Sequence, residues 1–300
     1  MRPGMTIVSV GEILWDVIGE DEHLGGAPFN FAVNVSRLGH EVLFVSGVGD
    51  DARGRRAVDQ AQALGLSTDY IKTVEGFPTG LATVELDADG QPSFQVQRPA
   101  AYDRVALTEQ DVREIAARQP DWIYFGTLCQ LSSQARRLTE QLIGSAPQAR
   151  RFYDVNLRPD SYTPALVEAL CTDATVLKLS ESEADTLAGW FDLPIDSIED
   201  FCRRATDRFG WQAVVVTRGA DGCTLLMGDE FCESPGVRIQ VADAVGAGDA
   251  FSAAFLHGLS AGWPARQVAE FANRVGALVA SRRGATPVWT LDDIQPAATE

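Results

Sequence analysis

The stretch DAVGAGDAF, residues 243–251, sets three small residues directly before an acidic one. Gly246, Ala247 and Gly248 carry little or no side chain, so their backbone N–H groups can approach an anion closely. The helical spacing that follows would put them at a helix N-terminus, where free amides and the helix dipole favour phosphate. A carboxylate repels phosphate, so Asp249 makes chemical sense as the acceptor of a proton from an attacking hydroxyl. A plain helix cap explains this stretch, taken alone, equally well.

A second glycine-rich stretch, LGGAPFNFAVNVSRLG, occupies residues 24–39. Pro28 suits a first helical turn, and Asn30 would project near the start of that helix. Asp16 follows the first apolar run, and open α/β sheets bind ligands beyond the carboxyl ends of their strands. Arg158 follows DVN and could face phosphate or substrate, or be merely solvated. These side chains therefore need a scaffold that brings distant segments to one edge of a sheet.

Short β-rich apolar runs recur along the chain, most of them separated by stretches of helical period. They lie at 6–12, 41–49, 121–128, 151–157, 174–180, 212–219 and 223–228. This alternation is typical of helices on both faces of a sheet, so we expect a doubly wound, mostly parallel α/β fold. Residues 79–97 alternate on both sides of Asp89-Gly90, which predicts a β-hairpin, either a lid over the main sheet or an ordinary edge hairpin.

Together the two glycine-rich stretches resemble the signature motifs of the ribokinase-like (PfkB) carbohydrate kinases, GGxxxNxAxxxxxLG and DxxGAGD. The resemblance covers almost the whole chain and includes GEILWD, VGDDxxG, DVNLRP, LKLSESE and VTRGADG. Within the family, GGAPFN and GEILWD look most like fructokinases. Two positions depart from the pattern: Ala244, where many members have Thr, and Ser180, where the motif N-x-x-E usually has Asn. These departures bear on efficiency or cation preference more than on the reaction class.

The resemblance implies one ribokinase-like domain over 1–300, with a small β lid formed by about 13–25 and 77–103. It implies Asp249 as the catalytic base, with the amides of Gly246, Ala247 and Gly248 as an anion hole. It also implies a sugar-binding group of Asp16, Gly26 and Asn30, to which we add Arg158 as a contact. A homodimer formed through the lid is implied by the resemblance alone.

A nucleotide site is implied as well, and ATP with Mg²⁺ is the expected cofactor. The residues that resemble the nucleotide side of the family are Lys178, Glu183, Thr217, Gly219, Gly222 and Asn273. Glu183 would hold Mg²⁺ through water. Asp243 and the turn at 282–286, which contains Gly284, resemble the monovalent-cation site of family members, so potassium dependence is a further prediction.

The composition and charge of the chain argue against several classes of protein. The formal net charge of -17 argues against nucleic acid, whose phosphates are bound by clustered Lys and Arg. No apolar run is long enough for a membrane span and no signal-peptide pattern is visible, so we expect a cytoplasmic protein with no membrane partner. The five cysteines are scattered, as for reduced buried thiols, and the three histidines form no cluster of metal ligands. The near absence of lysine raises the hypothesis of a salt-adapted host.

Other functions are less consistent with the sequence. A dinucleotide-binding reductase is suggested by VLFVSGVGDDA, a G-x-G-x-x-A after a strand, but Asp50 and Asp51 would face the pyrophosphate. P-loop and protein-kinase motifs are absent from the sequence. A sugar sensor without turnover would not need Asp249. We therefore expect transfer of the ATP γ-phosphate to a small sugar, fructose first, with 2-keto-3-deoxygluconate as the alternative because Arg158 could pair with a carboxylate.

Overall fold

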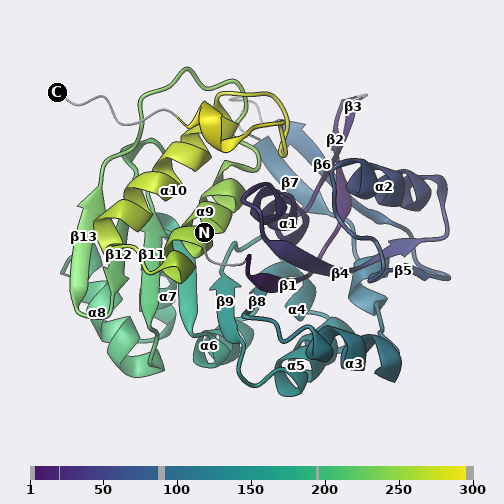
Figure 1. Cartoon of the computed structure of the whole chain (residues 1–300), viewed down its shortest axis with the longest axis horizontal. Coiled ribbons are helices and arrows are strands. Elements are labelled where there is room, and N and C mark those ends of the chain that lie inside the picture. Colours follow the sequence, from purple (N-terminus) through teal and green to yellow (C-terminus); the bar gives the residue numbers. More distant parts are fainter. Residues whose placement is uncertain (1–3, 20, 87–91, 194–195, 295–300) are drawn as a thin grey trace.

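A nine-stranded sheet forms the centre of the computed structural model, which describes residues 4–19, 21–86, 92–193 and 196–294 (Figure 1). The strand order is β13-β12-β11-β10-β9-β8-β1-β4-β5, and every neighbouring pair is parallel except the two that involve β12. The strands are β1 Thr6–Val10, β4 Glu41–Gly49, β5 Ile71–Val74, β8 Trp122–Gly126, β9 Arg150–Asp154, β10 Val176–Ser180, β11 Ala213–Thr217, β12 Cys223–Met227 and β13 Glu230–Ser234. The expected doubly wound, mostly parallel sheet is confirmed.

Both faces of this sheet are buried, which explains the continuous apolar runs. In β1, Ile7 belongs to one hydrophobic cluster while Val8 and Val10 belong to the other, because successive side chains point to opposite faces. One cluster is covered by α1 Ala27–Arg37, α2 Ala52–Ala63, α9 Ala247–Ala261 and α10 Ala265–Ala280. The other is covered by α3 Glu109–Ala117, α5 Ser133–Ser145, α6 Pro164–Asp173, α7 Glu181–Trp190 and α8 Ile198–Phe209.

A second, four-stranded sheet lies beside the first and contains both segments expected to form the lid. Its order is β3-β2-β6-β7, with β2 Leu14–Ile18, β3 Asp21–Gly25, β6 Gly80–Leu86 and β7 Pro92–Val96. The strands β6 and β7 pair antiparallel, as the alternation at 79–97 predicts, although the expected turn at Asp89-Gly90 lies outside the described residues. The register sets Asp16 opposite Ala82, and Ala82 opposite Val96.

The expected strands end earlier than their apolar runs at two points that matter for the site. The run 6–12 gives a strand that stops at Val10, and the run 151–157 gives one that stops at Asp154. Glu12 and Asn156 therefore lie on loops beyond the carboxyl ends of β1 and β9. These loops are where an open α/β sheet places its ligand.

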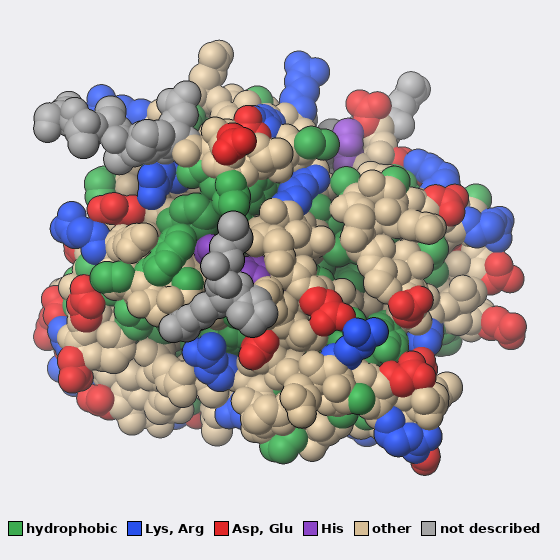
Figure 2. All heavy atoms as spheres, viewed as in Figure 1, with side chains coloured by type: hydrophobic (Ala, Val, Ile, Leu, Met, Phe, Trp, Pro, Cys, Tyr) green, Lys and Arg blue, Asp and Glu red, His purple; other side chains and the backbone are tan. Residues whose placement is uncertain are grey.

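The surface agrees with the composition. Acidic and basic side chains are interspersed over the face drawn in Figure 2, which shows no large basic patch. Within the described residues, no helix has the length and apolar character needed to cross a membrane. Four of the cysteines are buried, Cys232 is half-buried, and all five are free thiols.

Candidate active site

A cavity of about 380 Å³ opens at the carboxyl edge of the large sheet, between the small sheet and the first turns of α1 and α9. It is lined by eight of the residues singled out from the sequence: Asp16, Gly26, Asn30, Arg158, Lys178, Gly246, Gly248 and Asp249. These residues come from widely separated parts of the chain. A larger hollow of about 530 Å³ lies near the starts of β8 and β9, but none of the residues singled out lines it.

The first turn of α9 presents backbone donors to this cavity. Gly246 caps the helix with a φ of 78°, and a Cβ there would lie 2.1 Å from the carbonyl oxygen of Ala285, so only glycine fits. The amides of Gly248 and Asp249 have no acceptor among the described residues. The amide of Ala247 donates to the carbonyl of Ala244 at 3.3 Å. The amides of Gly248 and Asp249 are thus open toward the cavity, whereas that of Ala247 is engaged in the turn, and the anion hole expected at Gly246, Ala247 and Gly248 remains a prediction.

Asp249 is held at the cavity wall by a partner from the other glycine-rich stretch. The side-chain nitrogen Nδ2 of Asn30, in α1, donates to Oδ2 of Asp249 at 2.9 Å. Burial, reinforced by the negative charge of Asp154, raises the pKa of Asp249 to about 6, although the Asn30 hydrogen bond and Lys178 oppose the rise. A carboxylate with this pKa is ionised at neutral pH and still basic enough to take a proton.

The wall across the cavity is made by β2 and the turn before α1. Burial raises the pKa of Asp16 to about 6, against the lowering effect of Arg158. A Cβ on Gly25 would lie 2.5 Å from Oδ2 of Asp16, and one on Gly26 would lie 2.5 Å from the carbonyl oxygen of Glu12. The two glycines therefore let the backbone pass close to both acids. The side-chain oxygen of Asn30 is buried here without a donor among the described residues.

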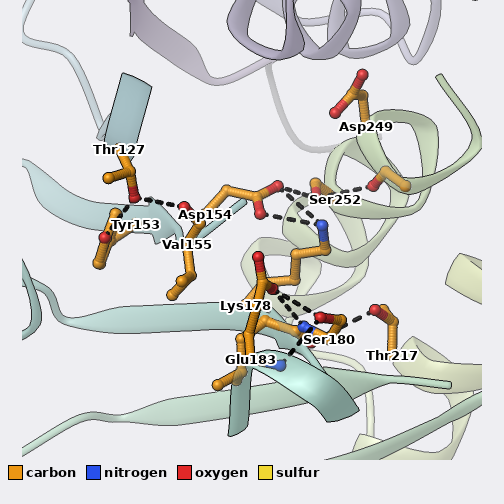
Figure 3. Close-up of polar contacts among 12 residues, drawn as sticks. Thr127, Tyr153, Asp154, Val155, Lys178, Ser180, Glu183, Thr217, Asp249 and Ser252 are labelled. Atoms are coloured by element: carbon orange, nitrogen blue, oxygen red, sulfur yellow. Dashed lines mark hydrogen bonds and ion pairs between the residues drawn. The ribbon is translucent and has the colours of Figure 1, made fainter. Parts of the chain in front are cut away.

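A buried ion pair lies between the strand ends and α9 (Figure 3). Nζ of Lys178 on β10 contacts the two carboxylate oxygens of Asp154 on β9 at 3.0 and 3.2 Å, and the two residues are register partners. Asp154 also accepts from Tyr124 at 3.0 Å and from Ser252 at 2.9 Å. Burial alone would lower the pKa of Lys178, but the charge of Asp154 raises it, so the ammonium stays charged. Nζ lies 3.5 Å from the position of a Cβ on Gly248, beside the free amides.

The structure sets Glu183 just outside the cavity. Glu183 and Ser180 form a capping box at the start of α7, in which the amide of Ser180 donates to Oε2 at 2.7 Å. The other carboxylate oxygen accepts from the amide of Leu157 at 2.6 Å, which ties α7 to the loop that carries Arg158. Ser180 thus works as a helix cap where the family pattern has Asn.

The remaining residues expected to bind nucleotide or a monovalent cation do not line the cavity. Thr217 ends β11, and Gly219 and Gly222 follow it in a tight turn with φ values of 56° and 91°. Asn273 is buried and donates to the carbonyl of Ser234 at 3.2 Å. Asp243 accepts from the amides of Val245 and Gly284, each at 3.0 Å, so it joins the loop before α9 to the 282–286 turn. Their expected roles remain predictions.

Two residues that line the cavity, Glu12 and Asn156, were not predicted as site residues, although both belong to motifs that carry the family resemblance. Glu12 of GEILWD is 4% exposed, accepts a long contact of 3.4 Å from the thiol of Cys129, and has a pKa raised by burial. Asn156 of DVNLRP has a φ of 38°, the left-handed conformation that Asn tolerates better than most residues. The signal available in the sequence was that both are polar residues at or near the end of an apolar run, 6–12 or 151–157.

Comparison with known proteins agrees with this architecture. The profile of the pfkB family carbohydrate kinases matches residues 7–291. The chain is 31% identical over 278 residues to fructokinase-1 of Oryza sativa subsp. japonica, covering 88% of this chain and 84% of that one. It is 30% identical over 285 residues to the 2-dehydro-3-deoxygluconokinase of Dickeya dadantii, covering 87% and 88%. The structure of a fructokinase with bound ATP from Xylella fastidiosa superposes with a TM-score of 0.82 at 26% identity, covering 94% of each chain. With its two glycine-rich stretches meeting at one cavity, this chain belongs to the pfkB family of carbohydrate kinases.

Proposed function

We propose that this ATP-dependent sugar kinase phosphorylates fructose. The observation that carries the proposal is the Asn30–Asp249 pair, which faces the cavity beside the open amides of α9 and across from Asp16. Such an arrangement offers acceptors for sugar hydroxyls, a base for one of them, and donors for the transferred phosphoryl group. The presence of fructokinases among the relatives supports fructose as the acceptor ahead of other small sugars.

In this mechanism Asp16 and the free side-chain oxygen of Asn30 accept hydrogen bonds from sugar hydroxyls. Asp249 accepts the proton of the hydroxyl that attacks the γ-phosphorus. The new O–P bond forms as the bond to the β–γ bridging oxygen breaks, so ADP leaves with that electron pair. The amides of Gly248 and Asp249 and the ammonium of Lys178 stabilise the charge on the transferred group, because they are already oriented when the reaction begins.

Magnesium fits this donor set as an ion held mainly by phosphate and water. Among the described residues, no three His, Cys, Asp or Glu side chains converge as metal ligands. Glu183 accepts three donors, from Leu157 and from the amide and hydroxyl of Ser180, which leaves about one of its roughly four lone-pair sites for a metal-bound water. When bound, Mg²⁺ would neutralise charge on the ATP phosphates. We assign Glu183 to orient one of its waters.

Potassium dependence remains part of the proposal. Asp243 already bridges two loops through the backbone amides of Val245 and Gly284, and the carbonyl oxygen of Ala285, in the 282–286 turn, lies close to Gly246. A monovalent cation held by these loops would fix the turn before α9. If replacing K⁺ with tetramethylammonium leaves the rate unchanged at saturating Mg·ATP, no such site operates.

A second acceptor, 2-keto-3-deoxygluconate, is favoured by one observation. Arg158 lines the cavity, its only side-chain hydrogen bond within the described part of the chain is to the carbonyl of Leu157, and it has no carboxylate within ion-pair distance there. Its guanidinium is therefore available to a substrate carboxylate. The Dickeya dadantii relative acts on such a substrate by name.

An ADP-release assay over fructose, mannose, ribose, 2-keto-3-deoxygluconate and adenosine decides among these acceptors. We expect the highest kcat/KM with fructose. The Arg158→Lys variant is the matched probe, because it keeps the charge but loses the bidentate geometry. A large loss with 2-keto-3-deoxygluconate and little change for fructose would assign Arg158 to the carboxylate of the acid, whereas a higher wild-type kcat/KM with the acid than with fructose would reverse the order of the two candidates.

A further inference from the structure

The VGDDxxG motif contributes nothing to the cavity lining, yet it makes closely packed contacts with the small sheet. Asp51 caps α2 by accepting from the amide of Gly54 at 2.7 Å. Its other oxygen accepts from the amide of Thr79 at 2.8 Å, and the hydroxyl of Thr79 donates to Oδ1 at 2.7 Å. Thr79 is 3% exposed and directly precedes β6. A single carboxylate thus joins the start of α2 to the start of a small-sheet strand.

The two glycines of the motif allow this junction to be tight. A Cβ on Gly49 would lie 2.6 Å from the carbonyl oxygen of Phe77 and 2.7 Å from the amide nitrogen of Thr79. A Cβ on Gly54 would lie 2.1 Å from the carbonyl oxygen of Gly49. The amide of Gly49 also donates to the hydroxyl of Thr79 at 3.0 Å. The end of β4, the start of α2 and the start of β6 are consequently fixed relative to one another.

The first two turns of α2 also contact two other strands of the small sheet, β2 and β3. Arg53 and Arg56 contact the two carboxylate oxygens of Glu22 on β3 at 2.6 and 2.8 Å. The indole nitrogen of Trp15 on β2 donates to the carbonyl of Arg53 at 3.1 Å, and the guanidinium of Arg56 lies 4.3 Å from the centre of the Trp15 ring. Helix α2 therefore contacts β2, β3 and the residue before β6 at once.

These contacts lie behind the sugar-facing wall of the cavity. Trp15 is buried in the core cluster that α2 helps to cover, whereas its neighbours Leu14 and Asp16 line the cavity. The alternation is that of a β-strand, whose successive side chains point to opposite faces. In addition, Asp16 is the register partner of Ala82, three residues beyond Thr79. A shift of β6 or β2 on α2 would move the carboxylate of Asp16.

We propose that the first two turns of α2 hold the small sheet in position, and that Asp51 is a positioning residue. Its hydrogen bonds to Thr79 fix the start of β6, and the pairing of β6 with β2 then fixes Asp16. The inference rests on the proposed sugar-binding role of Asp16. It assigns to the VGDDxxG motif a role on the acceptor side of the reaction, because none of these contacts reaches the first turn of α9 or the ATP-side loops.

The test compares two neighbouring acids. Asp51→Asn replaces one carboxylate oxygen by an NH₂ group, which then faces the backbone amide of either Thr79 or Gly54, donor against donor. Asp50→Asn removes only an exposed ion pair with Arg55. We expect Asp51→Asn to raise the KM for the sugar roughly tenfold to a hundredfold, with the KM for ATP within about twofold. Asp50→Asn should change neither. Thr79→Ser keeps both contacts to Asp51 and should behave like the wild type.

Hydrogen exchange provides a readout that does not need the sugar to be known. Asp51→Asn should speed amide exchange in residues 14–17 and 80–83 but not at the start of α9. If Asp51→Asn does not fold, Glu22→Gln is the substitute variant, and it should speed amide exchange in residues 14–17. Equal rises in both KM values, or unchanged exchange in the two strands, would overturn the proposal. If the wild type phosphorylates no tested sugar but the exchange pattern appears, the proposed function is wrong, and the positioning of the small sheet by Asp51 and α2 is still supported.

Discussion

The acid side of the pH–rate profile offers the sharpest test of the site, because two of its carboxyl groups share an unusual property. Burial raises the pKa of Asp16 and of Asp249 to about 6 each. In the proposed mechanism both must be ionised, Asp249 to act as the base and Asp16 to accept hydrogen bonds from sugar hydroxyls. Activity should therefore be full well above pH 6 and be lost as the pH falls through 6.

The size of the loss follows from these values. At pH 5 a group with a pKa of about 6 is ionised roughly one tenth of the time, so both are ionised together roughly one hundredth of the time. Accordingly kcat/KM should fall roughly a hundredfold between pH 7 and pH 5. At saturating sugar, Asp16 is held ionised by its bound hydroxyls, so kcat should fall only about tenfold and report Asp249.

Two variants separate the causes of the raised pKa of Asp249. After burial, the charge of Asp154 contributes most to raising its pKa, whereas Lys178 lowers it. Asp154→Asn should therefore move the acid limb of kcat to lower pH, and Lys178→Met should move it to higher pH, in steady-state assays between pH 4.5 and 8. Ser252→Ala is the control, because it removes one hydrogen bond to Asp154 and leaves the charge. Limbs that move in the same direction, or a wild-type limb centred near pH 4, would refute this reasoning.

Three further changes test separate parts of the molecule. Gly246→Ala should lower the melting temperature measured by circular dichroism and reduce kcat at least tenfold, because a positive φ and a carbonyl contact both exclude a Cβ. Asn30→Ala should reduce kcat/KM for the sugar roughly tenfold to a hundredfold with the KM for ATP unchanged, since Asp249 loses its donor and the sugar loses an acceptor. The imidazoles of His40 and His257 are 2.8 Å apart, and burial lowers the pKa of His40 to about 4. Stability should thus be lost as the pH falls from about 6.5 toward 4 in urea titrations, and His257→Phe should flatten that dependence.

The large sheet could be predicted from the sequence, because a strand that is buried on both faces is a continuous apolar run. The sequence did not predict β5 or β13, because each has only one buried position among four or five residues and so lacks a clear apolar pattern. The apolar pattern did not predict β3 either, because DEHLG carries little of the signal by which strands are recognised; only the family resemblance, which implies a lid over about 13–25, covers this strand.

The residues of the candidate site likewise include some that the sequence predicts and some that it does not. The motifs identified Asp16, Asn30 and Asp249, because glycine spacing and helix starts are local features of the chain. The partner that tunes Asp249, Asp154, could not be identified, since its pairing with Lys178 depends on the register of two strands 24 residues apart. Local patterns say which residue types are present, whereas register decides which of them meet.

The hydrogen bond between Asn30 and Asp249 joins residues 219 positions apart. Asp16 lies on β2 and Asn30 on α1, whereas Asp249 and the open amides beside it belong to α9. If Asp249 is the base, a fragment that ends before α9 should therefore transfer no phosphate, however well its other segments fold. The proposed site depends on two distant segments at once, and neither glycine-rich stretch forms it alone.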